Sequence, residues 1–109
     1  MFTYMKHLKG LEEVSAVLNS DGKHVFMFSA PWCGDCRYIE PFMESVMNRY
    51  PELDFYYINR DDHIALCQRW EIMGIPSFVG FEGHKEIGRF VSSLRKTEAE
   101  ICAFLDSIK

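Results

Sequence analysis

Two cysteines separated by two residues, Cys33 and Cys36, are the side chains in this sequence best suited to chemistry. They follow the apolar run Val25–Phe28 and open a long helical pattern, so the pair lies where a strand gives way to a helix. A cysteine at a helix N-terminus faces unpaired backbone N–H groups, which favour the thiolate. One helical turn brings the second cysteine close enough to form a disulfide. The pattern predicts a redox dithiol with Cys33 as nucleophile and Cys36 as resolving thiol.

The alternative interpretation of such a pair is half of a zinc site. A zinc site requires further ligands, but Cys67 and Cys102 are far apart in the sequence and the four histidines show no paired spacing. We therefore expect no metal ion and no organic cofactor, because the cysteines themselves carry the electrons. Cys67 and Cys102 are expected to be buried free thiols on amphipathic helices, with a regulatory disulfide as the minor alternative.

The order of elements around this pair predicts the fold. Helical periodicity covers residues 11–18, 33–50, 63–70 and 97–108, and short apolar runs at 25–28, 53–58 and 77–81 indicate strands, the last joined by a turn to residues 85–91. Two strand–helix–strand crossovers followed by a hairpin give a three-layer α/β fold with a mixed central β-sheet flanked by helices.

Local signals refine this prediction. Asp61 or Asp62 is expected to be the N-cap of the third helix, and Thr97 with Glu100 has the pattern of a capping box. A short strand near Phe2–Met5 is expected to add an edge to the sheet. The following methionines are expected to fill gaps in the core rather than to bind copper: Met27, Met43, Met47 and Met73.

Composition limits the class of protein. A chain of 109 residues with 48% hydrophobic and 15% aromatic content is expected to form one globular domain, residues 1–109. A net charge of −4 gives no basic surface for nucleic acid or anionic membranes. No apolar run reaches the length of a membrane span, and residues 1–8 lack the apolar core of a signal peptide. We therefore expect a cytoplasmic protein, where a Cys-x-x-Cys pair is expected to cycle between redox states.

Three motifs give the sequence a resemblance to a known family. Trp32-Cys33-Gly34-Asp35-Cys36 resembles the active-site motif of thioredoxin, with Asp35 where thioredoxin usually carries proline. Gly74-Ile75-Pro76-Ser77 resembles the family's cis-proline loop, and Pro41 also matches. The resemblance extends over residues 11–108. It implies a thioredoxin-like fold and thiol–disulfide oxidoreductase activity.

The resemblance also implies how substrates bind. Pro31 and Trp32 would form an apolar lip beside the nucleophile. The Ile75–Pro76 bond would be cis and would face Cys33, so that the backbone of Ile75 is free to pair with an extended substrate. The expected partners are disulfide-containing protein or small-molecule substrates and, for recycling, a reductase or a low-molecular-weight thiol. The chain is expected to act as a monomer.

Departures from the family pattern affect proton transfer and docking. Met27 occupies the position of a buried aspartate that assists the second cysteine, and Tyr57 replaces the lysine that usually accompanies it. Ser92 and Ser93 stand where thioredoxin has a glycine on its substrate-binding face. Asp35 is either a proton acceptor for Cys36 or a solvated residue of the first helical turn.

The function predicted from these residues is the reduction of disulfides. Two alternatives stay open from sequence. One is an oxidant or peroxide-linked redox partner of narrow specificity, which uses the same chemistry in another direction. The other is a redox-idle adaptor that uses the fold for binding alone.

Overall fold

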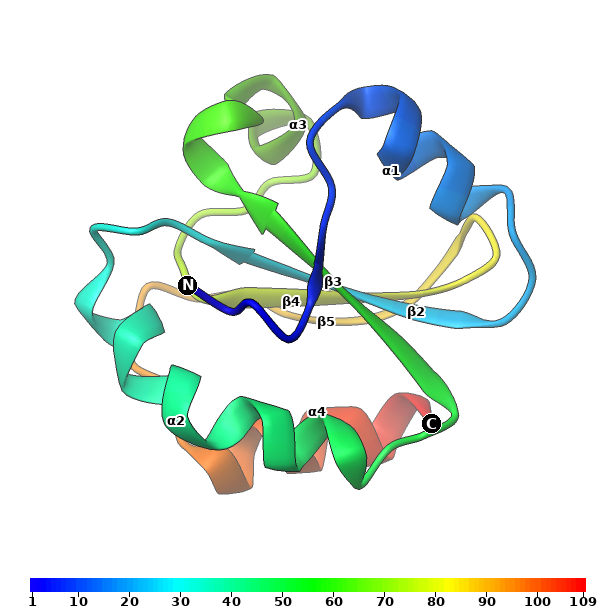
Figure 1. Cartoon of the computed structure of the whole chain (residues 1–109). Helices are drawn as coiled ribbons and strands as arrows, with labels where there is room; N and C mark the ends of the chain where they lie inside the picture. The colour runs from blue at the N-terminus through cyan, green and yellow to red at the C-terminus, as the bar shows by residue number, and fades with distance from the viewer.

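A five-stranded mixed sheet lies between two pairs of helices. The computed structural model describes residues 1–109. The strand order is β1-β3-β2-β4-β5, with α1 and α3 on one face of the sheet and α2 and α4 on the other (Figure 1). The elements are β1 (Lys6–His7), α1 (Leu11–Leu18), β2 (Lys23–Ser29), α2 (Gly34–Asn48), β3 (Leu53–Asn59), the 3₁₀ helix η1 (Arg60–Asp62), α3 (Ile64–Arg69), β4 (Ser77–Glu82), β5 (Lys85–Phe90) and α4 (Glu98–Ile108). The predicted three-layer α/β fold is confirmed.

Strand β2 occupies the centre of the sheet and leads directly to the cysteine pair. It runs parallel to β3 and antiparallel to β4. Its residues from His24 to Ser29 are all buried, because helices cover both faces. A strand buried on both sides needs a continuous apolar run, which is what Val25–Phe28 supplies. Since β2 is held on both edges, the turn that follows it is anchored in the most stable part of the sheet.

The last helix begins where its capping pattern predicts. The hydroxyl of Thr97 accepts a hydrogen bond from the backbone N–H of Glu100, and the Glu100 carboxylate accepts one from the backbone N–H of Thr97. This reciprocal capping box satisfies two of the free N–H groups at the helix start. On the inner face of α4, Ile101, Leu105 and Ile108 are buried, as the periodicity predicts.

The N-terminal edge of the sheet differs from the prediction. The edge strand is β1 at Lys6–His7, which pairs in parallel with Tyr56 and Tyr57 of β3, rather than Phe2–Met5. Phe2 is instead fully buried in a turn, and its φ of 53° is in the left-handed region. The apolar residues near the N-terminus therefore pack in the core without forming a strand. The pattern of apolar residues in the sequence does not distinguish packing in the core from pairing in the sheet.

The start of α3 also differs. Asp61 and Asp62 lie in η1, and His63 is the N-cap of α3 without a side-chain capping bond. The residue with a side-chain capping bond is Asn59, which caps η1: its side-chain carbonyl accepts a hydrogen bond from the N–H of Asp61 at 2.9 Å. The prediction of an aspartate N-cap was wrong because an additional short turn precedes the helix.

Two predicted core residues are exposed. Met73 is 81% exposed, whereas Met27 and Met43 are fully buried and Met47 packs against the core. Leu11, the first residue of α1, is likewise exposed. Met73 lies in the loop between α3 and β4, outside any helix or strand.

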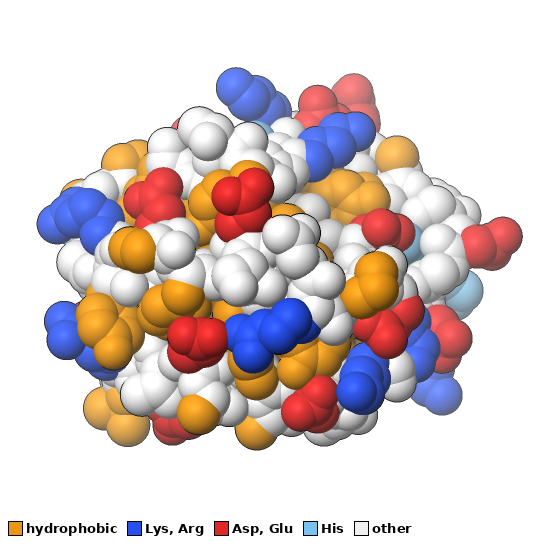
Figure 2. Space-filling model, turned by 60° about the horizontal axis from the view of Figure 1, so that its bottom comes forward, with side chains coloured by type: hydrophobic (Ala, Val, Ile, Leu, Met, Phe, Trp, Pro, Cys, Tyr) orange, Lys and Arg blue, Asp and Glu red, His pale blue; other side chains and the backbone are white.

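The surface agrees with the charge balance of the sequence. The view in Figure 2 shows acidic and basic side chains interspersed with hydrophobic ones, without a broad region of one sign on that face. None of the helices is long and apolar enough to cross a membrane.

Candidate active site

The two cysteines of the motif are joined at the start of α2. Cys33 and Cys36 form a disulfide, and their Cα atoms are 5.2 Å apart. Cys33 is the N-cap residue of α2, and its sulfur accepts a hydrogen bond from the backbone N–H of Cys36 at 3.1 Å. The same N–H group is available to a thiolate on Cys33 after reduction. A backbone N–H at a helix N-terminus is the kind of hydrogen-bond donor that stabilises a thiolate.

The two sulfurs differ in accessibility. Cys33 retains 5% of its exposure and Cys36 retains none. The Cys33 sulfur also lies 3.7 Å from the carbonyl oxygen of Ile75, and the Ile75–Pro76 peptide bond is cis, as the family resemblance implies. Of the two cysteines, only Cys33 thus retains any exposure, and a backbone carbonyl oxygen lies beside its sulfur.

Trp32 is a surface residue that the fold holds in place. It is 58% exposed and therefore lies outside the core. Its indole N–H donates to the carboxylate of Asp61 at 2.8 Å, and the guanidinium of Arg60 lies 5.9 Å from its ring centroid. Residues of η1 thus orient the aromatic ring of the residue that precedes Cys33. Sequence reasoning missed this role of Asp61, because the two partners are 29 residues apart.

The turn between β2 and α2 is closed by two further contacts. Arg37 donates from Nη1 to the carbonyl oxygen of Pro31 at 2.8 Å, and the N–H of Cys33 donates to the carbonyl oxygen of Ala30 at 3.1 Å. Both contacts fix the backbone on either side of Trp32. Pro31 is exposed at the rim of this turn.

Asp35 makes an ion pair that the sequence does not reveal. Its Oδ1 accepts a hydrogen bond from Nε of Arg95 at 3.0 Å, and the Arg95 guanidinium stacks 4.5 Å from the ring centroid of Tyr38. Asp35 is half-buried, so it is not simply a solvated residue of the first turn. One carboxylate oxygen is committed to Arg95, and the other makes no hydrogen bond within the protein.

A buried ammonium organises the loop that carries Arg95. Lys96 is 1% exposed, and its Nζ donates to the carbonyl oxygens of Ser92 and Leu94 and to the hydroxyl of Ser92, at 3.1–3.2 Å. Burial lowers the pKa of this ammonium, and the charge of Asp35 partly opposes that change. The three hydrogen bonds compensate a buried charge that would otherwise be unfavourable. Lys96 therefore holds residues 92–95 against the start of α2.

The same loop packs against the cis-proline loop. A Cβ on Gly74 would collide with the backbone of Ser92 and Ser93, so only glycine allows this approach. The two serines that replace the family's glycine are thus part of a close backbone contact, with Ser92 half-buried and Ser93 exposed.

The positions behind the disulfide hold no carboxylate. Met27 is fully buried and lies opposite Tyr57 of β3 in the sheet register. Tyr57 is also buried, and burial raises the pKa of its phenol. Both side chains belong to the same core cluster as Cys33 and Cys36. Buried methionine and tyrosine side chains therefore occupy the two positions that the resemblance assigns to the aspartate and its lysine.

The remaining cysteines lie outside the site. Cys67 and Cys102 are both free thiols; Cys67 is buried and Cys102 is half-buried. Burial raises the pKa of Cys67, which makes its thiol a poor nucleophile at neutral pH. No group of three or more His, Cys, Asp or Glu side chains is arranged to hold a metal ion.

Comparison with known proteins places this geometry in a family. The family described as Thioredoxin matches residues 6–107. Thioredoxin-1 of Saccharomyces cerevisiae is 31% identical over 85 residues, which cover 78% of this chain and 82% of the yeast protein. Thioredoxin H2-2 of Oryza sativa subsp. japonica is 33% identical over 84 residues, 76% of this chain and 63% of the rice protein. The match thus spans a little under two thirds of the rice relative.

The fold is shared with solved structures as well. The X-ray structure of Fasciola hepatica thioredoxin superposes with a TM-score of 0.82 at 25% identity, covering 96% of this chain and all of that one. These matches and the joined Cys33–Cys36 pair support thiol–disulfide oxidoreductase function. The chain belongs to the thioredoxin family.

Proposed function

We propose that this chain reduces disulfides by thiol–disulfide exchange, with Cys33 as nucleophile and Cys36 as resolving thiol. The observation that carries the proposal is the bonded pair at the start of α2, in which Cys33 alone retains some exposure and its sulfur receives a backbone hydrogen bond. The Cys33 thiolate attacks one sulfur of the substrate disulfide, and the other sulfur leaves as a thiolate. Cys36 then loses its proton and attacks the Cys33 sulfur of the mixed disulfide, which breaks the bond to the substrate and releases the substrate's remaining sulfur as a second thiolate. Two electrons pass to the substrate, and the Cys33–Cys36 disulfide remains.

Substrate contacts are proposed for the two loops beside Cys33. Pro31 and Trp32 form the exposed rim on one side, and half-buried Ile75 with buried Pro76 forms the other side. The carbonyl oxygen of Ile75, close to the reacting sulfur, is a suitable acceptor for the backbone N–H of an extended substrate.

The proposed partners and cellular compartment follow from the same chemistry. The reduced dithiol must be regenerated, so the proposed partners are disulfide-containing proteins or small molecules as substrates and a reductase or low-molecular-weight thiol as electron donor. We propose a monomeric domain of residues 1–109 that works in the cytoplasm. The free thiols of Cys67 and Cys102 are in keeping with a reducing compartment.

The direction of electron flow is tested by the reduction potential of the Cys33–Cys36 pair. We expect a value near that of reducing members of this class, about −270 mV, measured by equilibration with glutathione. A value near −120 mV would instead identify an oxidant. A wild-type protein that fails to reduce insulin disulfides in the presence of dithiothreitol would support the adaptor alternative.

Asp35 is proposed to accept the proton of Cys36 through its free carboxylate oxygen, while Arg95 balances its charge. An anion near the Cys33 thiolate raises the pKa of that thiol, and a cation lowers it. Asp35→Asn should therefore quicken the alkylation of Cys33 by iodoacetamide at pH 7, and Arg95→Gln should slow it, each by roughly twofold for charges interacting through solvent. The double variant should resemble the wild type.

The rate of insulin reduction distinguishes the two proposed roles of Asp35, proton acceptor for Cys36 and negative charge near Cys33. If its carboxylate takes the proton of Cys36, Asp35→Asn should slow insulin reduction even though Cys33 reacts faster. Equal turnover in Asp35→Asn and wild type would remove the proton-acceptor role and leave only the electrostatic one.

A further inference from the structure

An apolar groove runs between α1 and α3, which lie side by side on one face of the sheet (Figure 1). It consists of two hollows, one of about 290 Å³ and one of about 110 Å³. The remaining hydrophobic residues that line one hollow or the other are Val14, Leu18, Ile64, Ala65 and Trp70. Because Leu11, Leu66 and Arg69 line both hollows, the two adjoin and form one groove along the helices.

The floor of the groove is packed, whereas its rim is exposed. Leu66 is buried, and the Trp70 ring packs against that of Phe81 with centroids 5.2 Å apart. On the rim, Leu11 is 56% exposed and Ile64 is 52% exposed. A packed floor can receive an apolar side chain without rearrangement, which lowers the cost of binding. Covering the rim would remove two large apolar side chains from water.

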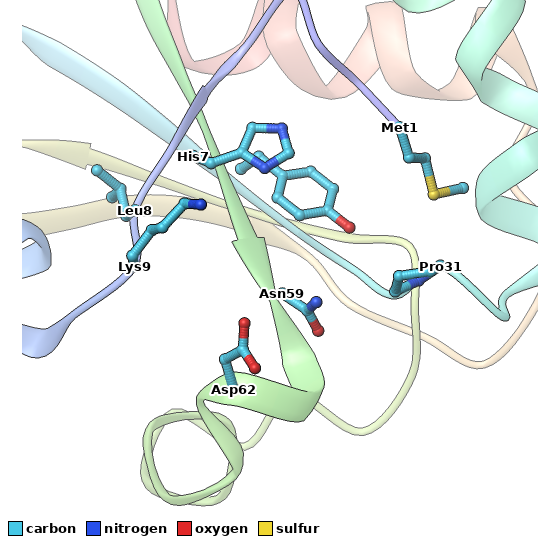
Figure 3. Close-up of a pocket in the computed structure, with 8 residues that line it drawn as sticks. Met1, His7, Leu8, Lys9, Pro31, Asn59 and Asp62 are labelled. Carbon is cyan, nitrogen blue, oxygen red and sulfur yellow. The ribbon is translucent and has the colours of Figure 1, made fainter.

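Arg69 places an unpaired cation in the wall shared by the two hollows. Its guanidinium is exposed and belongs to none of the protein's ion pairs. Asp62 is the only carboxylate in the lining, and it points into a neighbouring polar cavity of about 260 Å³ that is also bordered by His7, Lys9 and Asn59 (Figure 3). Because a guanidinium binds a carboxylate through two parallel hydrogen bonds, Arg69 is suited to an acidic side chain from a partner.

We propose that this groove binds an amphipathic helical segment of a protein partner, whose apolar side chains fill the two hollows while an adjacent carboxylate pairs with Arg69. Successive turns of such a helix present apolar side chains in a row, as two adjoining hollows require. The net charge of −4 disfavours an anionic lipid surface. Two copies related by a twofold axis would place two unpaired Arg69 guanidinium groups in one interface. Since α2 covers the other face of the sheet, binding in the groove leaves the cysteine pair free (Figure 1).

The charge is tested with two synthetic fluorescein-labelled amphipathic peptides, titrated with the full chain and followed by fluorescence anisotropy. One peptide has leucines along one face and a glutamate beside them, and the other has glutamine in place of the glutamate. We expect saturable binding of both peptides. Arg69→Gln should weaken the glutamate peptide about tenfold, the effect of losing one charge-assisted hydrogen bond. It should change the affinity of the glutamine peptide by less than about twofold, because no carboxylate is lost there.

The apolar contacts are tested with Leu11→Ser and Ile64→Ser. Each should weaken both peptides to the same extent, by about fivefold, because the lost contact is apolar and does not depend on the glutamate. Both side chains are exposed in the free protein, so the urea midpoints of the variants should match that of the wild type. A loss of affinity at an unchanged midpoint then reports on the groove and not on the fold.

Matched controls remove the same types of side chain outside the groove. Lys85→Gln removes an exposed cation from the start of β5, and Leu94→Ser removes a leucine that is 73% exposed in the loop after β5. Neither control should change the affinity of either peptide. The inference is overturned if neither peptide binds saturably, if Arg69→Gln weakens both equally, or if the controls weaken binding as much as the groove variants. Sedimentation that shows a dimer of the free protein, lost in Leu11→Ser, would overturn it in favour of a second copy.

Discussion

Replacing Cys36 with serine should trap substrates on the protein, whereas replacing Cys33 with serine should trap none. In Cys36→Ser, the accessible Cys33 thiolate can still attack a substrate disulfide, but no second thiol is placed to release it. In Cys33→Ser, the remaining sulfur is fully buried. The difference follows from exposure and from the N-cap position, since both give Cys33 the first step.

The measurement is the yield of covalent adduct with insulin on non-reducing gels, followed by mass spectrometry to locate the bonded cysteine. Cys102→Ser is a matched control, because it removes a free thiol away from the pair and should trap nothing while retaining turnover. Insulin reduction should be abolished in both active-site variants. Equal trapping by Cys33→Ser and Cys36→Ser would show that the order of attack is wrong.

Local sequence signals predict most of the framework that positions this site. The buried run Val25–Phe28, the hairpin after residue 77 and the capping box at Thr97 each depend on residues within a few positions of one another. Such signals are readable because backbone geometry and burial act over one turn or one pleat. The cysteine pair could be predicted for the same reason, since its spacing in the sequence is enough to bring the two sulfurs together.

The contacts around the site, in contrast, join residues that are far apart in the sequence. Asp35 meets Arg95 across 60 residues, and the Lys96 ammonium is buried by a loop that its own hydrogen bonds fold. Neither periodicity nor composition marks these pairs, because tertiary structure alone brings them within reach. Met73 shows the same limit. Its side chain is hydrophobic and was expected in the core, but it lies in the loop before Gly74 and is exposed.

Met27→Asp should lower the free energy of unfolding by about 2–4 kcal/mol at pH 7. Met27 is fully buried in the hydrophobic cluster that also contains the cysteine pair and Tyr57. The buried carboxyl would have a raised pKa in the folded state, since burial disfavours its charged form. Urea denaturation of the variant and of the neutral, isosteric Met27→Asn measures the contribution of the charge.

The sign of the pH dependence makes this prediction specific. A carboxyl whose pKa is higher in the folded than in the unfolded state is destabilising once the unfolded chain ionises, above about pH 4. Met27→Asp and Met27→Asn should therefore be equally stable below pH 4 and should diverge as the pH rises. The divergence stops when the pH passes the folded pKa. A constant difference at all pH values would show that the carboxyl has the same pKa in the folded and unfolded states, and hence that this position is not apolar.

The same pair of variants tests what the missing carboxylate means for catalysis. A carboxylate behind Cys36 offers a second proton acceptor for the resolving step, which an amide of equal size cannot provide. We expect Met27→Asp to quicken insulin reduction relative to Met27→Asn, with the gain largest in the Asp35→Asn background, where the surface acceptor is absent. If the two Met27 variants reduce insulin at equal rates in both backgrounds, proton removal from Cys36 does not limit turnover. The methionine would then be retained for stability alone.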